Sequence, residues 1–160
     1  MKLGELLRNL DVLDASAAMD MEITGVSYDS RKTQPGDLFV AIRGFESDGH
    51  KFIPAAMSRG AAAVLCEEAP SDGTPYVRVA DCRKGLAYVS REFFGDPAKE
   101  MTLVGITGTS GKTTSSYLIK HMLEMKLDAK VGLIGTNGNM IGSECLHSDH
   151  TTPESYELHK

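Results

Sequence analysis

Hydrophobic and polar positions along the first hundred residues switch repeatedly between helical and strand spacing. The chain opens with four leucines at the i, i+3, i+4, i+7 spacing of one helix face, namely Leu3, Leu6, Leu7 and Leu10. Strand-like runs follow at residues 23–28 and 38–42, and a short helix ends at Gly60 before the continuous apolar run of residues 61–66. Because strand and helix alternate, the pattern predicts an α/β fold with a buried parallel sheet.

A polar interruption near residue 97 divides this pattern in two. After a strand-like run at 76–79, Asp81 is suited to cap a helix, and Gly95-Asp96-Pro97 then breaks that helix. We place the domain boundary at this break, so that residues 1–97 form one domain and residues 98–160 belong to another.

The second segment begins a new α/β unit. An apolar run at 102–107 predicts a strand, a glycine-rich loop follows, and residues 112–126 predict a helix before a second apolar run at 131–135. Asn137-Gly138 favours a two-residue hairpin turn, and residues 151–154 favour the start of a further helix. The order strand, loop, helix, strand predicts a unit of the βαβ kind.

Composition and charge argue against several classes of protein. The 160 residues carry a formal net charge of −5 and no cluster of Lys or Arg, which argues against a nucleic-acid surface. No apolar run approaches the ~20 residues that span a bilayer, so we expect no membrane insertion and a cytoplasmic location. Three cysteines without a C-x-x-C pair indicate neither a disulfide framework nor a zinc ribbon.

The segment GITGTSGKTT, from Gly105 to Thr114, lies between the predicted strand and helix, as a nucleotide-binding phosphate loop does. Its glycines let backbone N–H groups converge on phosphate oxygens, and the helix that follows adds the positive end of its dipole. Lys112 is suited to reach the β- and γ-phosphates and is the candidate catalytic residue, while the hydroxyl of Thr113 is suited to ligate Mg²⁺. The candidate nucleotide-binding residues are Gly108, Thr109, Ser110, Gly111, Lys112, Thr113 and Thr114.

This loop departs from the strict G-x-x-x-x-G-K-[ST] form, because Ile106 stands where the first glycine would be. One alternative is a glycine-rich turn with a chance Lys-Thr pair, but strand, loop, helix and Gly-Lys-Thr-Thr occur together here and favour the phosphate loop. A small P-loop kinase or GTPase is a weaker alternative. In such proteins the loop usually lies near the N-terminus, whereas about a hundred residues precede it here.

The loop resembles the ATP loop of the Mur ligase superfamily, which also includes folylpolyglutamate and cyanophycin synthetases. Three earlier motifs resemble the UDP-binding domain of the Mur ligases that form the tripeptide and the pentapeptide: Asp29-Ser30-Arg31, residues 35–41 and residues 48–52, DGHKF. The Gly135-Thr136 turn and residues 150–154, HTTPE, are more similar to the tripeptide-forming members. The resemblance therefore runs across nearly the whole chain.

The resemblance implies an α/β fold in which an N-terminal UDP-substrate domain is followed by the beginning of the P-loop ATP-binding central domain. It implies ATP and Mg²⁺ as cofactors. Ser30 and Arg31 would lie at the UDP end of the substrate, and Thr151 and Thr152 would contact its muramoyl-dipeptide part. The family's uracil contacts do not transfer to Phe45-Glu46-Ser47, which departs from the family pattern. We expect a monomer.

The reaction implied is ATP-dependent addition of a diamino acid to UDP-N-acetylmuramoyl-L-Ala-D-Glu, through an acyl phosphate on the D-glutamate carboxyl. In the family a glutamate, a modified lysine and a C-terminal domain come later, and no strand ending in Asp or Glu follows residues 131–135 here. We therefore expect a truncated fragment that keeps UDP-substrate binding and lacks ligase activity. The choice between diaminopimelate and lysine as the added residue stays open.

Two other functions remain alternatives, the pentapeptide-forming Mur ligase and a non-catalytic UDP-sugar-binding module. Without the family pattern, Asp29-Ser30-Arg31 is a solvated turn and residues 151–154 are a helix cap. A metal site is a further alternative, suggested by three histidines near one cysteine, but their spacing matches no zinc motif. These residues are Cys145, His147, His150 and His159.

Overall fold

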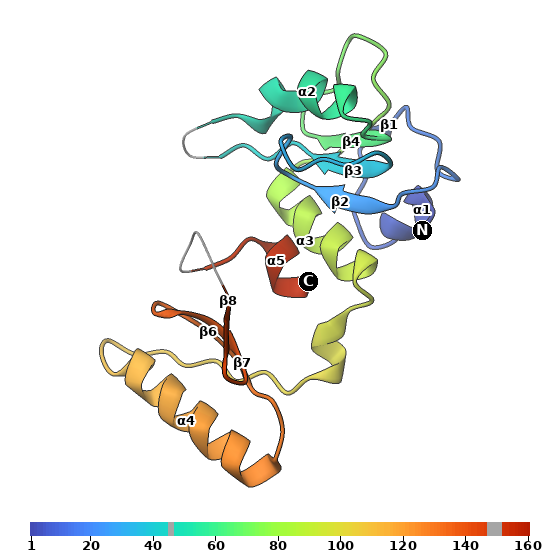
Figure 1. The fold of residues 1–160 in the computed structure, drawn as a ribbon. Coiled ribbons are helices and arrows are strands. Elements are labelled where there is room, and N and C mark those ends of the chain that lie inside the picture. Colours follow the sequence, from blue (N-terminus) through green and yellow to red (C-terminus); the bar gives the residue numbers. More distant parts are fainter. Residues whose placement is uncertain (45–46, 147–151) are drawn as a thin grey trace. The chain divides into compact units, whose positions relative to one another are not determined.

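A computed structural model describes residues 1–44, 47–146 and 152–160 of the chain (Figure 1). It divides into two compact units, an N-terminal unit of residues 1–100 together with residues 159–160, and a C-terminal unit of residues 101–158. Within the described ranges, no helix has the length and apolar character needed to cross a membrane.

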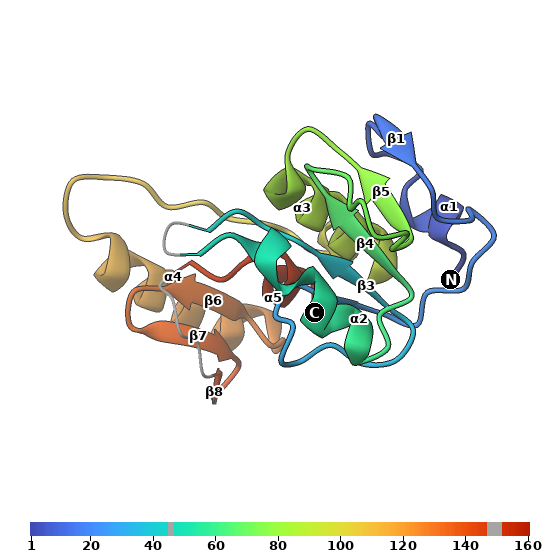
Figure 2. The ribbon, with the colours of Figure 1, turned by 90° about the horizontal axis from the view of Figure 1, so that it is seen from above.

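The N-terminal unit is built on a five-stranded sheet in the order β1-β5-β4-β3-β2 (Figures 1 and 2). Neighbouring strands from β2 to β5 run parallel, and β1 pairs antiparallel with β5 at the edge. The strands are β1 (Asp14–Ala15), β2 (Gly25–Ser27), β3 (Asp37–Val40), β4 (Ala63–Cys66) and β5 (Tyr76–Arg78). The predicted parallel sheet is thus confirmed.

Helices cover both faces of this sheet, which is why its central strands, apart from Asp37 at the start of β3, are continuously apolar rather than alternating. Every residue of β3 and β4 is buried. One face packs against α2 (Ile53–Ser58), and the other against α3 (Cys82–Phe93) (Figures 1 and 2). The short helices are α1 (Leu3–Leu6), η1 (Gly49–Phe52) and η2 (Pro97–Glu100).

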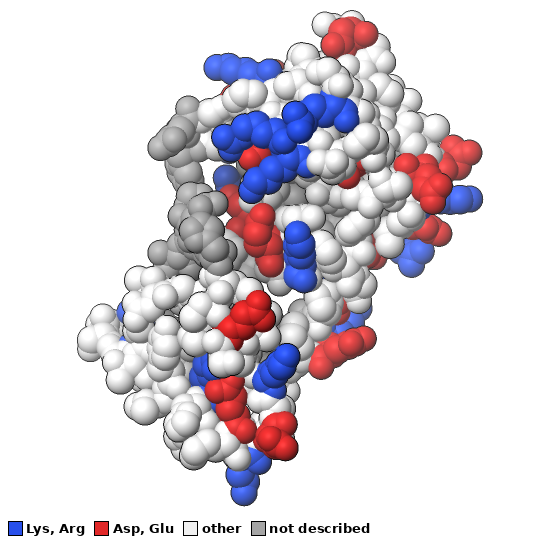
Figure 3. Space-filling view, viewed as in Figure 1, with Lys and Arg blue, Asp and Glu red and all other residues white. Residues whose placement is uncertain are grey.

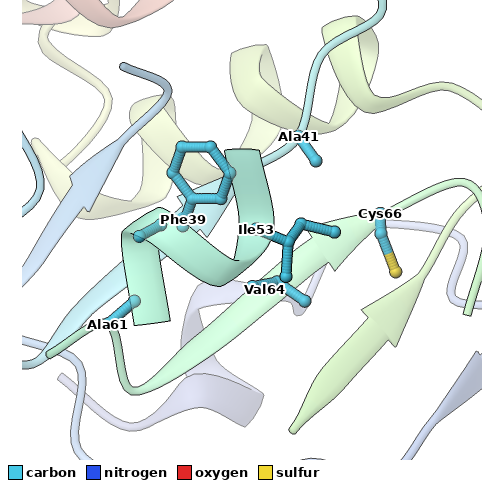
Figure 4. Close-up of a cluster of buried hydrophobic side chains, with 7 residues drawn as sticks. Phe39, Ala41, Ile53, Ala61, Val64 and Cys66 are labelled. Carbon is cyan, nitrogen blue, oxygen red and sulfur yellow. The ribbon is translucent and has the colours of Figure 1, made fainter. Parts of the chain in front are cut away.

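Successive residues of β4 divide between the two cores. Val64 and Cys66 join Phe39 and Ile53 in the cluster beneath α2 (Figure 4). Leu65 points the other way and meets α3 so closely that a Cβ added at Gly85 would lie 2.7 Å from its Cδ2 atom. The alternation follows from the two-residue period of a strand.

The helix cap predicted at Asp81 is confirmed, because its carboxylate accepts hydrogen bonds from the N–H groups of Arg83 and Lys84. The helix ends at Phe93, and Gly95 follows with φ of 78°, a conformation that glycine adopts without strain.

The C-terminal unit consists of one long helix, a three-stranded antiparallel sheet in the order β6-β7-β8, and a short final helix. Its elements are α4 (Lys112–Leu127), β6 (Gly132–Gly135), β7 (Gly138–Ile141), β8 (Glu144–Leu146) and α5 (Ser155–His159). The hairpin predicted near Asn137-Gly138 forms, with its turn at Thr136-Asn137, one residue earlier than predicted.

The strand predicted over residues 102–107 is wrong for this structure. Those residues form no strand, and Leu103 and Val104 are 72% and 60% exposed. A strand is stabilised by hydrogen bonds to a neighbouring strand, and within the described ranges this run pairs with none. The expected βαβ arrangement is therefore replaced by a helix followed by an antiparallel meander.

Candidate functional site

The predicted phosphate loop leads directly into α4. Gly111 is the N-cap of this helix with φ of 75°, and Gly108 has φ of 154°. Both values favour glycine over residues with a side chain. The first-turn N–H groups of a 16-residue helix therefore open onto an exposed glycine loop, which is the arrangement that binds phosphate.

Lys112 folds back over this loop. Its Nζ atom donates a 2.6 Å hydrogen bond to the carbonyl oxygen of Gly108. The ammonium group thus lies among the residues that the sequence singled out from Gly108 to Thr114, all of which the structure brings together. A lysine held by one carbonyl of an exposed loop is free to exchange that partner for a phosphate oxygen.

Thr113, the predicted Mg²⁺ ligand, lies half-buried in the first turn of α4 beside the loop. A hydroxyl at that place fits a cation held mainly by phosphate oxygens. Among the residues that the structure describes, no group of three or more His, Cys, Asp or Glu side chains could hold a metal ion. In the described part of the chain, Thr113 is thus a candidate Mg²⁺ ligand that no cluster of carboxylate ligands accompanies.

In the N-terminal unit, the loop after β2 is closed by its own hydrogen bonds. The buried hydroxyls of Ser27 and Thr33 lie 3.0 Å apart, and Thr33 also donates to the carbonyl of Asp29 at 3.3 Å. Arg31 donates from Nε and Nη2 to both carboxylate oxygens of Asp29, at 2.9 and 2.8 Å. This holds Arg31 in one direction while leaving its side chain 87% exposed, and Ser30 lies half-buried between the two.

Two further cations, Lys32 and Arg59, lie at this loop, and the sequence singled out neither of them. Arg59, at the end of α2, donates from Nε to the carbonyl of Thr33 at 3.4 Å. Hydrogen bonds from Arg31, aided by the charge of Lys32, hold the pKa of the Asp29 carboxyl below its usual value. Lys and Arg side chains gather on one face of this unit (Figure 3). Arg59 could not have been found from sequence spacing, because it lies more than twenty positions from the loop.

The carboxyl ends of β2, β3 and β4 open on one edge of the parallel sheet. The Asp29 loop leaves β2 there, the hairpin Arg43–Asp48 leaves β3, and Glu67 follows β4. In open α/β sheets, ligands bind outside the carboxyl ends of the strands. Phe45 and Glu46 lie outside the described residues.

The remaining candidates divide between the two units. Ser30 and Arg31 belong to the N-terminal unit, whereas Lys112, Thr113 and Thr152 belong to the C-terminal unit. Thr152 is exposed and precedes α5. Thr151 lies outside the described residues, as do His147 and His150 of the alternative metal site.

Two family models match the chain. Residues 22–99 match a model described as Mur ligase family, catalytic domain, and residues 106–160 match one described as Mur ligase middle domain. The proteins named UDP-N-acetylmuramoyl-L-alanyl-D-glutamate--2,6-diaminopimelate ligase in Chlorobium phaeobacteroides and Bacteroides fragilis are 43% and 41% identical to it. These alignments cover 99% and 100% of this chain but 32% and 33% of the relatives, so the chain spans about a third of their length.

Solved structures give the same result. A structure of UDP-N-acetylmuramoyl-L-alanyl-D-glutamate--2,6-diaminopimelate ligase matches 99% of this chain and 32% of its own, with a TM-score of 0.73 and 27% identity. MurF ligase from Thermotoga maritima in complex with ADP matches 66% of this chain and 24% of its own, with a TM-score of 0.51 and 32% identity. Both family models, the relatives and the solved structures agree, and the chain therefore belongs to the Mur ligase family.

Proposed function

We propose that this protein is an ATP-dependent amide-forming ligase of peptidoglycan precursor synthesis, which adds the third residue to UDP-N-acetylmuramoyl-L-Ala-D-Glu. The observation that carries the proposal is the glycine loop with Lys112 at the N-terminus of α4. Such a loop binds the phosphates of a nucleotide. The names of the relatives favour 2,6-diaminopimelate over lysine as the amino acid.

The chemistry of amide formation explains why a phosphate loop is needed. A carboxylate is a poor electrophile, so one of its oxygens first attacks the γ-phosphorus of ATP and ADP leaves. The amine of the incoming amino acid then attacks the acyl carbon of the resulting acyl phosphate, and inorganic phosphate leaves as the amide forms. In this scheme Lys112 and the first-turn N–H groups of α4 neutralise charge on the transferred phosphoryl group, and Thr113 contributes a ligand to Mg²⁺.

The two parts of the chain divide these tasks. We assign residues 1–97 to binding of the UDP part of the substrate, with Ser30 and Arg31 as contacts, and residues 98–160 to the start of the ATP-binding domain. Thr151 and Thr152 are assigned to the muramoyl-dipeptide part. The cationic face formed by Arg31, Lys32 and Arg59 supports the first assignment, because it suits a diphosphate.

Calorimetric titration with UDP-N-acetylmuramoyl-L-Ala-D-Glu, and separately with Mg-ATP, tests this proposal. We expect the UDP substrate to bind and the Arg31→Ala variant to bind it about tenfold more weakly, the effect of losing one charge-assisted contact. Arg8→Ala, which removes another exposed arginine of the same unit, is the matched control and should bind normally. Tight binding of Mg-ATP without binding of the UDP substrate would overturn the assignment of the first domain.

The pentapeptide-forming Mur ligase is the second candidate, because solved MurF structures also match, at 32% identity for the Thermotoga maritima protein. The substrate of that candidate already carries the third residue. Titration with the UDP-muramoyl tripeptide beside the dipeptide therefore separates the two, since the tripeptide-forming ligase should prefer the dipeptide. If the protein binds the UDP-muramoyl dipeptide or tripeptide but the whole protein forms no amide, the result would favour a non-catalytic UDP-sugar-binding module.

A further inference from the structure

A cavity of about 560 Å³ lies at the end of α3 in the N-terminal unit. The residues that follow α1 form one wall, and the last turn of α3 with the start of η2 forms the rest. Its charged and amide lining residues are Arg8, Asn9, Arg91, Glu92, Asp96 and Lys99. Pockets that hold small molecules measure roughly 300–1,000 Å³, so the cavity has room for more than a single ion.

This cavity lies apart from the Asp29 loop. Strands β2 to β5 run parallel, so β5 ends at the same carboxyl edge of the sheet at which the Asp29 loop leaves β2. Helix α3 begins shortly after β5 and packs along the sheet for 12 residues, a length of about 18 Å. The cavity is at the far end of this helix, away from the region that we assign to the UDP part of the substrate.

Both carboxylates of the cavity are already engaged by donors of its own lining. Oε1 of Glu92 accepts a hydrogen bond from Nη2 of Arg91 and another from Nδ2 of Asn9, each at 2.8 Å. These two bonds lower the pKa of the Glu92 carboxyl. Oδ2 of Asp96 lies 2.9 Å from Nζ of Lys99. The carboxylates therefore join the walls of the cavity to one another.

The two arginines, in contrast, keep donors that the lining does not use. Within the described ranges, the exposed side chain of Arg8 forms no hydrogen bond or ion pair. The Nε atom of Arg91 is buried and donates to no acceptor there, since Oδ2 of Asp96 lies 3.9 Å away. A buried N–H group without an acceptor is costly, and an acceptor that enters the cavity would relieve this cost.

The turn after α3 gives the cavity a fixed wall. Gly95 and Asp96 follow one another with φ of 78° and 57°, a conformation that is uncommon for a residue with a side chain. The N–H of Asp96 donates to the carbonyl of Arg91 at 2.8 Å, and the carbonyl of Asp96 accepts the N–H of Lys99 at 3.0 Å. Such residues persist where the surrounding bonds hold them, so this wall exists before any ligand binds.

The charges of the lining favour an anion. Three cations and two carboxylates leave a net charge of +1, and the carboxylates are engaged by Arg91 and Lys99. Guanidinium groups bind carboxylate and phosphate through paired N–H donors. The two oxygens of a carboxylate lie in one plane, whereas a phosphate presents oxygens in several directions. A phosphate can therefore accept from two arginines that belong to different segments.

We propose that this cavity is a separate anion site, in which Arg8 and Arg91 bind the phosphate group of a small molecule. The bond to Glu92 orients the guanidinium of Arg91, and the unpaired side chain of Arg8 is free to turn towards the ligand. The site is distinct from the phosphate loop and does not rest on the proposed function.

Titration of the isotope-labelled chain with inorganic phosphate, followed by NMR at constant ionic strength, tests this inference. The backbone amides of Arg8 and Asn9 and the Nε–H of Arg91 report on the cavity, whereas the amides of residues 108–114 report on the phosphate loop. Arg8→Gln removes the charge and Arg8→Lys keeps it. Arg83→Gln is the matched control, because it removes an exposed arginine at the opposite end of α3. The fold does not depend on the unpaired side chain of Arg8.

We expect the cavity resonances of the natural chain to shift and saturate. Arg8→Gln should bind phosphate about tenfold more weakly, the loss of one charge-assisted contact, with Arg8→Lys within about threefold of the natural chain. Arg83→Gln should bind phosphate normally. Malonate, which carries carboxylates in place of phosphate, should bind more weakly than phosphate.

Cavity shifts that do not saturate, or that are the same in Arg8→Gln and the natural chain, overturn the inference. Tighter binding of malonate than of phosphate overturns the assignment to phosphate. The affinity of Arg8→Gln for UDP-N-acetylmuramoyl-L-Ala-D-Glu should equal that of the natural chain, because the cavity lies apart from the Asp29 loop. Weaker binding of that substrate would overturn the inference of a separate site and leave the proposed function standing.

Discussion

Lys112 and Gly108 close the phosphate loop on itself, with the lysine ammonium 2.6 Å from the glycine carbonyl oxygen. The same contact holds the positive charge beside the first-turn N–H groups of α4. Two sources of positive potential, the lysine and the helix dipole, therefore lie together before any nucleotide binds. The loop is arranged for an anion, and among the residues that the structure describes the lysine ammonium has one neutral hydrogen-bond partner to exchange.

The first prediction concerns that lysine. Lys112→Met should leave the unfolding midpoint nearly unchanged, because the side chain is exposed and its partner carbonyl can bond to water. Amide resonances of residues 108–114 should shift on addition of millimolar Mg-ATP to the natural chain, and far less in the variant. Lys126→Met, at the exposed far end of α4, is the control. Identical shifts in Lys112→Met and the natural chain would contradict a role for Lys112 in phosphate binding.

The second prediction compares two glycines of the same loop. Gly111 has φ of 75°, so alanine there should cost roughly 1–2 kcal/mol in left-handed backbone strain. Gly105 has no such angle and no atom within 4 Å of an added Cβ, so Gly105→Ala should be tolerated. Hydrogen exchange of the Ser115 amide, whose N–H donates to the carbonyl of Gly111 at 2.9 Å, measures the difference. Faster exchange in Gly105→Ala than in Gly111→Ala would show that the loop has another conformation.

The third prediction concerns Lys120, the one buried residue of α4. Its ammonium donates to Glu124 at 2.6 Å and to the carbonyl of Gly142 at 2.7 Å, which joins the helix to the turn between β7 and β8. Lys120→Met should destabilise this packing by about 1–3 kcal/mol, because the Gly142 carbonyl loses its partner.

Hydrogen exchange of the β7 and β8 amides, compared with the exposed Lys126→Met variant, measures this loss. The same exchange rates in both variants would mean that Lys120 does not anchor the turn.

Continuous apolar runs made the central strands predictable. Residues 38–42 and 61–66 appear in the structure as β3 (Asp37–Val40) and β4 (Ala63–Cys66), because a strand buried on both faces carries few polar side chains. The run at 102–107 has the same character and yet forms no strand, because a strand also depends on a partner, which local sequence does not reveal.

The candidate site was predictable only where its residues are contiguous. The loop from Gly108 to Thr114 could be predicted as a phosphate loop from spacing alone, since its candidate residues are contiguous along one turn of backbone. Arg59 and Glu67 could not be predicted, because their contacts are made only by tertiary folding. Arg59 donates to the carbonyl of Thr33, and the backbone N–H of Glu67 donates to His50. His50 was part of a recognised motif, but its protonation depends on the Glu67 N–H.

Cysteine ionisation gives the last prediction. Burial raises the pKa of the Cys66 thiol to about 11 and that of Cys82 well above its usual range, whereas Cys145 is exposed. A thiol whose pKa is higher in the folded state than the ~8.5 of the unfolded chain leaves stability unaffected below that pH. As the pH rises from about 8.5 towards 11, the unfolded chain loses protons that the folded chain keeps, so the free energy of unfolding should fall by roughly 1 kcal/mol per pH unit for each buried thiol.

Urea unfolding at pH 8 and pH 10 measures this fall. Cys66→Ala and Cys82→Ala should each make the pH dependence shallower, and Cys145→Ser should leave it unchanged, which separates the thiols from tyrosines and lysines that also titrate there. In the folded chain iodoacetamide should modify Cys145 first, because the thiolate is the reacting form and buried thiols are both protonated and inaccessible. Modification of Cys66 or Cys82 as fast as Cys145 would mean that the core beside β4 opens far more readily than its burial implies.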